Sequence, residues 1–124
     1  MTYEMGVVVA ERRLEAVAGD GTRASVVIRV GTPHPDPLSR NGDWCCPHQV
    51  VGLGDEAVSA SFGVDSLQAL LLGVYALRLG LAARAEEAGV ELDWLGVPEL
   101  GLTVVPPEFV PPGFVPPGFV PPSA

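Results

Sequence analysis

The chain of 124 residues contains no lysine, and its seven basic residues are all arginine. Without a lysine amine the protein cannot form a Schiff base with a carbonyl substrate, and it cannot supply the lysine of a Walker-type phosphate loop. The shortage of basic residues also leaves a formal net charge of -8. Nucleic acids and anionic membrane surfaces favour clustered basic side chains, so we expect neither as a partner. A basic protein partner fits this charge better.

Signals for export and for membrane insertion are also missing. Residues 1–13 contain Glu4 and Glu11, and they lack the basic start, apolar core and small-residue cleavage site of a signal peptide. The longest apolar run, residues 69–77, is far shorter than a membrane-spanning helix. We therefore expect a cytoplasmic protein with no membrane partner, in which the two cysteines are reduced.

Four short segments have the composition of β-strands. They are residues 7–17, 23–30, 43–53 and 57–62. The first two flank Asp20-Gly21, and this dipeptide between β-branched runs is a hairpin signal. Prolines at every second position of residues 32–37 exclude helix, so residues 32–42 are expected to form an extended loop. Consecutive short strands of this kind indicate an antiparallel β-meander.

One long helix is predicted over residues 65–88. Asp65 is a favourable N-cap residue, Gln68 follows three residues later as in a capping box, and Gly89 provides the stop. A stripe of apolar residues at helical spacing is expected to cover the sheet. The stripe consists of Leu67, Leu70, Leu71, Val74, Leu77 and Leu81. The predicted fold class is therefore α+β, with a small antiparallel β-meander of about four strands covered by one long C-terminal helix.

The composition changes at residue 106, where Phe-Val-Pro-Pro repeats begin. Proline-rich repeats form neither helix nor sheet ladder, so residues 106–124 are expected to be a disordered tail that samples polyproline II. Residues 1–105 are expected to fold as a single α+β domain, because about 100 residues are enough for one core. Within this domain, residues 90–105 are predicted to pack as irregular chain or as one more strand.

The predicted helix carries a second pattern, on the side away from the sheet-facing stripe. Spacings of three and four residues, typical of a seam between two helices, connect Ala69, Leu72, Ala76, Leu79 and Ala83. Small residues at such a seam let two backbones approach closely. We hypothesise that this face binds a second copy in a homodimer, or a helix of a protein partner. The alternative is that residues 90–105 fold back and cover it.

The residues best suited to chemistry are the cysteines and histidines. In a strand, Cys46 and His48 share one face with Trp44, so one hypothesis is a thiol site with Cys46 as nucleophile and His48 as base. Side chains two positions apart on a strand are about 6–7 Å apart, which is long for a hydrogen bond. The alternative is that Cys46 is a small buried apolar residue. The spacing fits no familiar zinc site, so we expect no metal and no cofactor.

Three short motifs occur in a fixed order along the chain. They read D-W-x-C-P, G-L-G-D and G-V-D-S-x-Q-A-L, at residues 43–47, 52–55 and 63–70. Together they resemble a family of short bacterial proteins described only as a domain of unknown function. The resemblance covers about residues 43–80 and implies a stand-alone bacterial domain, without implying an activity.

These observations favour a non-catalytic binding or accessory protein that acts through protein–protein contacts and has no catalytic residues. An immunity-like or antitoxin-like role against a basic partner would fit the acidic charge. The alternative, from a different functional class, is a small-molecule-binding protein or a thiol enzyme that uses Cys46 and His48.

Overall fold

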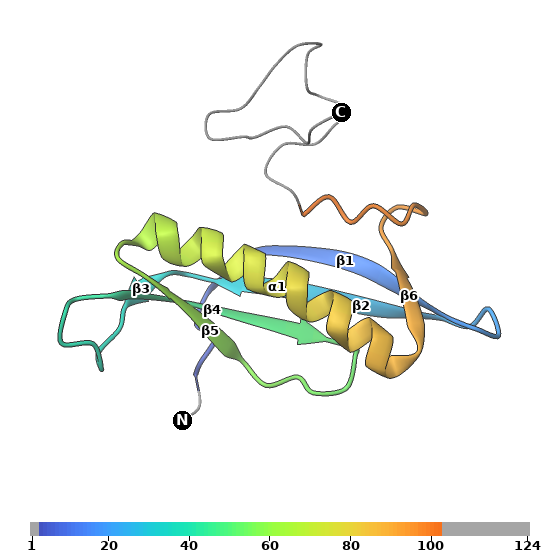
Figure 1. The fold of residues 1–124 in the computed structure, drawn as a ribbon, viewed down its shortest axis with the longest axis horizontal. Helices are drawn as coiled ribbons and strands as arrows, with labels where there is room; N and C mark the ends of the chain where they lie inside the picture. Colours follow the sequence, from blue (N-terminus) through green and yellow to red (C-terminus); the bar gives the residue numbers. More distant parts are fainter. Residues whose placement is uncertain (1–2, 103–124) are drawn as a thin grey trace, which may run out of the picture.

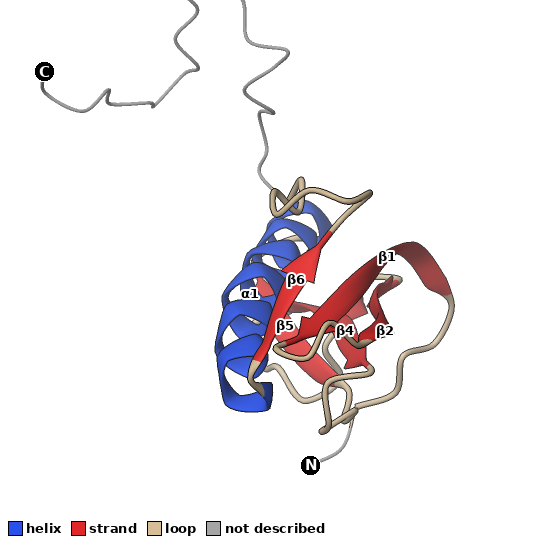
Figure 2. Cartoon of the chain, turned by 90° about the vertical axis from the view of Figure 1, so that its right-hand side faces the viewer, coloured by secondary structure: helices blue, strands red, loops and turns tan. Residues whose placement is uncertain are grey.

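The computed structural model of the chain describes residues 3–102, which form an antiparallel sheet with one helix packed on one of its faces (Figures 1 and 2). The elements in chain order are β1 (Val8–Ala18), β2 (Arg23–Gly31), β3 (His34–Pro35), β4 (Trp44–Val51), β5 (Ser59–Gly63), α1 (Ser66–Ala88) and β6 (Val90–Asp93). The α+β prediction is confirmed. The tail predicted over residues 106–124 lies outside the described residues.

The first hairpin forms where the Asp-Gly signal predicts it. In the turn, Ala18 N donates to Thr22 O at 2.9 Å, and Thr22 N donates to Asp20 Oδ1 at 2.9 Å. β1 and β2 then pair antiparallel, with Leu14 opposite Val26. The alternation along both strands turns these two residues toward the helix, where both are buried.

The sheet has six strands rather than the expected four. β4 pairs with β2 and β3 along one edge and with β5 along the other, because His48 is opposite Val30 on one side and Ser59 on the other. β3 is a two-residue strand inside the segment that was expected to be a loop. β6 adds to the free edge of β1, pairing Glu15 with Asp93. The helix is therefore followed by one more strand and is not the last element.

The helix begins and ends as its local sequence predicts. Asp65 Oδ1 accepts a hydrogen bond from Gln68 N at 2.8 Å, and Gln68 Oε1 accepts one from Val64 N at 2.7 Å. Gly89 ends the helix in a left-handed conformation, with φ 68°.

The sheet-facing side of α1 differs from the predicted leucine stripe. Its buried residues recur every four positions and are Ala69, Gly73, Leu77, Leu81 and Ala85. Leu67 and Leu71, which were expected on this side, are exposed, so that part of the prediction is wrong. The reason is close approach: a Cβ atom added at Gly73 would lie 3.2 Å from Cys46 Sγ, so a leucine does not fit between α1 and β4.

The chain after β6 folds along the side of the helix nearest β1. We call residues 94–102 the C-terminal strap. The guanidinium of Arg12 on β1 stacks on the Trp94 ring, 3.8 Å from its centroid, and donates to the carbonyl oxygens of Leu100 and Gly101 at 2.7 and 2.9 Å. One β1 side chain thus anchors both ends of the strap.

Candidate functional site

The proposed thiol pair lies in the interior, beneath α1. Cys46 is fully buried and His48 is 7% exposed. His48 Nε2 is 3.0 Å from Ser61 Oγ on β5, while Cys46 Sγ has only weak contacts to backbone carbonyls, the nearest at 3.7 Å. Within residues 3–102 no hydrogen bond joins Cys46 to His48. The structure places the two residues on one strand face without making them a nucleophile–base pair.

The electrostatics of this pair are those of a buried, neutral interior. Burial, with a smaller contribution from neighbouring Cys45, raises the pKa of the Cys46 thiol to about 11. Burial also lowers the pKa of His48, as does the positive charge of Arg84. A reactive cysteine requires the opposite, a lowered thiol pKa beside a basic group. In the described part of the chain, no group of three His, Cys, Asp or Glu residues is arranged to hold a metal ion.

The most unusual surface is the outward face of α1. Five large apolar side chains on it are between 41% and 62% exposed: Leu67, Leu71, Leu72, Tyr75 and Leu79. Arg78 is the only charged residue between positions 66 and 83, and its guanidinium lies 5.5 Å from the Tyr75 ring centroid. By length and composition alone α1 could cross a membrane, although the described structure packs one of its sides on the sheet. An exposed apolar surface of this kind is typical of a contact site.

The predicted seam residues divide between the core and this face. Ala69 is fully buried and belongs to the core, so it is not available to a partner. Leu72, Leu79 and Ala83 are exposed, and Ala76 is half-buried. From here on, "the seam" means Leu72, Ala76, Leu79 and Ala83. No pattern in the sequence separates Ala69 from the other four residues.

The alternative cover for the seam is the chain after the helix. In the described part, residues 90–102, this chain lines one hollow with Arg78, Ala82 and Ala85, and its last two residues line a second hollow that reaches Leu72. It leaves Leu72, Leu79 and Ala83 exposed. Residues 103–105 lie outside the described range. The strap anchor Arg12 was not predicted from the sequence, because its partners are about ninety positions away in the chain.

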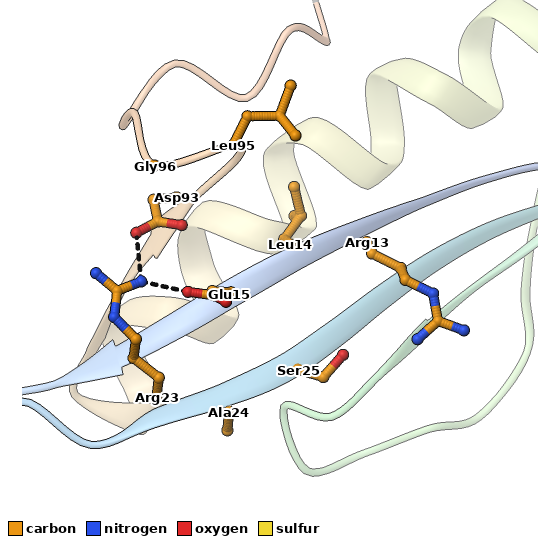
Figure 3. Close-up of a pocket in the computed structure, with 9 residues that line it drawn as sticks. All are labelled: Arg13, Leu14, Glu15, Arg23, Ala24, Ser25, Asp93, Leu95 and Gly96. Carbon is orange, nitrogen blue, oxygen red and sulfur yellow. Dashed lines mark hydrogen bonds and ion pairs between the residues drawn. The ribbon is translucent and has the colours of Figure 1, made fainter.

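A hollow of about 520 Å³ lies where β1, β2 and the start of the strap meet (Figure 3). Three of its four charged groups are paired: Arg23 forms ion pairs with Glu15 and with Asp93, the latter at 3.1 Å (Figure 3). The Arg13 side chain points away from this cluster (Figure 3). These ion pairs tie β6 to the first hairpin, and because the carboxylates are already neutralised, we interpret the hollow as structural.

Comparison with known proteins identifies a family. No curated protein and no solved structure matches the chain. One family model does match, over residues 10–104, and its description is Domain of unknown function (DUF6968). This range includes the three motifs noted in the sequence, β1 from its third residue, the whole of α1 and β6, and the strap. The chain belongs to this DUF6968 family.

Proposed function

We propose that the protein is a non-catalytic binding protein that acts through protein–protein contacts, and that the seam on α1 binds a second copy of the chain. The observation that carries the proposal is the exposed apolar face of α1 above a chemically inert interior. Within that face, the seam keeps the spacing of four, three and four residues that packs one helix against another.

The order of large and small residues supports a second copy as the occupant. In an antiparallel pair of helices related by a twofold axis near Leu77, Leu72 faces the partner's Ala83 and Ala76 faces the partner's Leu79. Each leucine then fills the space above an alanine, twice over by symmetry. The same seam against itself in a parallel arrangement would place leucine on leucine and alanine on alanine, which packs less evenly.

The distribution of charge supports the same occupant. Two copies that each carry a net charge of -8 repel one another, unless the contact surface holds few of those charges. Residues 66–83 contain no acidic residue, so the helix around the seam adds no such repulsion to the contact. The seam is only about 16 Å long at the rise of an α-helix, which is short for a standard interface. A dimer of micromolar affinity is therefore expected.

Light scattering across a micromolar concentration series tests the proposal. The wild type should shift from monomer to dimer as its concentration rises. Leu79→Arg and Ala83→Arg should remain monomeric and folded, because both positions are exposed. Ala82→Arg is the matched control, since Ala82 is also exposed on α1 but lies beside the strap. A wild type that stays monomeric throughout would refute the homodimer.

The acidic surface supports a further, basic protein partner for the dimer. The sequence contains fifteen acidic residues and seven arginines. This excess of negative charge favours a basic partner over nucleic acid or an anionic membrane. An immunity-like or antitoxin-like role, in a stand-alone bacterial protein of the cytoplasm, is consistent with this negative charge. The thiol-enzyme alternative gains no support, because Cys46 is buried and protonated.

A further inference from the structure

A small cavity lies between α1 and the adjoining parts of β4 and β5, on the side of the helix away from the strap. Its volume is about 120 Å³. His48 and Val50 line it from β4, Ser59 lines it from β5, and the helix contributes Ala76, Gly80 and Arg84. Space exists because two of the helix residues are small: a Cβ atom added at Gly80 would meet no heavy atom within 4 Å.

Four polar side chains line this cavity: His48, Gln49, Ser59 and Arg84. The His48 ring uses Nε2 to contact Ser61 Oγ, and within residues 3–102 its Nδ1 makes no hydrogen bond. Arg84 donates from Nη1 to the Asp55 carbonyl oxygen at 2.6 Å, and no carboxylate of the described residues lies within ion-pair distance of it. Ser59 adds a hydroxyl group. Among the described residues only Arg23 and Arg29 form ion pairs, so what distinguishes Arg84 is that its guanidinium is half-buried in a cavity lining beside a histidine.

The charges around the cavity favour an anion. Burial lowers the pKa of His48, and the positive charge of Arg84 also lowers it. The other side chains packed near His48, Cys46 on β4 and Ser61 on β5, are uncharged. The carboxylates of the loop that Arg84 contacts accept hydrogen bonds from that loop and from the end of β4: Asp55 Oδ1 accepts from Ala57 N and Glu56 Oε2 accepts from Gly52 N, both at 2.9 Å.

We propose that this cavity binds a small oxyanion, either a short monocarboxylate or inorganic phosphate, through an ion pair with Arg84 and hydrogen bonds from His48 and Ser59. The volume equals that of roughly four water molecules, which matches an anion of four or five heavy atoms. When the Ser61 hydroxyl donates to Nε2, the proton lies on Nδ1, so the imidazole can donate it to the anion. The site adjoins the seam, because Ala76 belongs to both, but the proposed anion contacts involve only the cavity lining.

The two histidines make a direct test possible by NMR of the full-length protein. Sodium acetate and sodium phosphate are titrated separately, with sodium chloride at equal ionic strength as the control. One of the two anions should shift the His48 ring signals along a saturable curve and raise the pKa of His48, because a bound anion stabilises the imidazolium. His34 is exposed on β3 and should not follow that curve, which makes it an internal reference.

Variants on one helix separate the site from general charge effects. Arg84→Gln should weaken binding at least tenfold, whereas Arg78→Gln, which removes the same charge from an exposed position, should leave it unchanged. If Arg84→Gln does not fold, Gly80→Leu is the second variant. The new leucine side chain has room to enter the cavity, so it should fill the cavity and abolish binding. Unsaturable shifts, equal shifts at both histidines, or unchanged binding by a folded Arg84→Gln or Gly80→Leu variant would overturn the proposal. Because the readout is ligand binding, a protein that stays monomeric would refute the dimer without overturning this proposal.

Discussion

Arg12 should contribute more to stability than any other charged residue of the described sheet. Arg12→Met keeps an apolar stem but removes the guanidinium that stacks on Trp94 and donates to Leu100 O and Gly101 O. A hydrogen bond from a charged donor contributes about 1.5 kcal/mol at the low end of its usual range, and we use this value because Arg12 is only half-buried. Stacking on the Trp94 ring adds about 0.5 kcal/mol. Two such bonds and the stacking together give an expected loss in free energy of unfolding of about 3.5 kcal/mol. For a domain of this size, that lowers Tm by roughly 10 °C or more.

Urea and thermal unfolding, followed by circular dichroism and by tryptophan fluorescence, measure this loss. The fluorescence of the Arg12→Met variant should differ from that of the wild type even at low urea, because Trp94 loses the guanidinium stacked on its ring. The signal of Trp44, which has no such partner among the described residues, should stay the same. Arg13→Met is the matched control: Arg13 is the next residue, is exposed, and points to the opposite face of β1. It should change the free energy of unfolding by no more than about 0.5 kcal/mol. If the two variants unfold alike, the reasoning about the strap anchor is wrong.

Two further predictions concern the interior. Cys46 should not react with a thiol reagent in the native protein at pH 8, because a pKa of about 11 leaves about one thiol in a thousand ionised; stoichiometric labelling before unfolding would contradict its burial. His48 should destabilise the fold as the pH falls below its ordinary pKa of 6.5, because its folded pKa is lower and the unfolded chain takes up the proton first. His48→Gln should flatten the Tm profile between about pH 7.5 and 5.5, and an unaltered slope would show that His48 is not its cause.

Features set by neighbouring residues were predictable from the sequence. The Asp20-Gly21 turn, the Asp65 cap with Gln68, and the Gly89 stop all depend on residues within a few positions of one another. Such interactions form in nearly the same way whatever the rest of the fold does. The α+β class followed from the same local signals.

The sheet-facing side of α1 was not predictable, because apolar residues occur all around the helix. Periodicity alone favours the leucine-rich side, whereas the structure buries the line that contains Ala69 and Gly73. What decides between them is how closely the helix approaches Cys46, and no pattern within the helix encodes that distance. β6 was missed as a definite strand for a similar reason, since its four residues pair with β1 more than seventy positions away.

The candidate sites show the same division. Strand alternation correctly placed Cys46 and His48 on one face, but it did not show that α1 covers them. The cavity beside His48 was not predicted at all, since Arg84 and Ser59 come from different elements and have no common motif. The exposed seam was anticipated from its spacing, and its occupant remains the proposal to be tested.

The most direct test of that proposal exchanges the sizes of two seam residues and measures self-association by sedimentation velocity. Leu72→Ala leaves a gap against the partner's Ala83, and Ala83→Leu places two leucines in one layer, so each single variant should dimerise more weakly than the wild type. The double variant restores one large and one small residue in each layer and should recover most of the wild-type affinity. Both positions are exposed, so all three variants should fold. A double variant no better than the weaker single variant, or a wild type that sediments as a monomer at every concentration, would contradict the account.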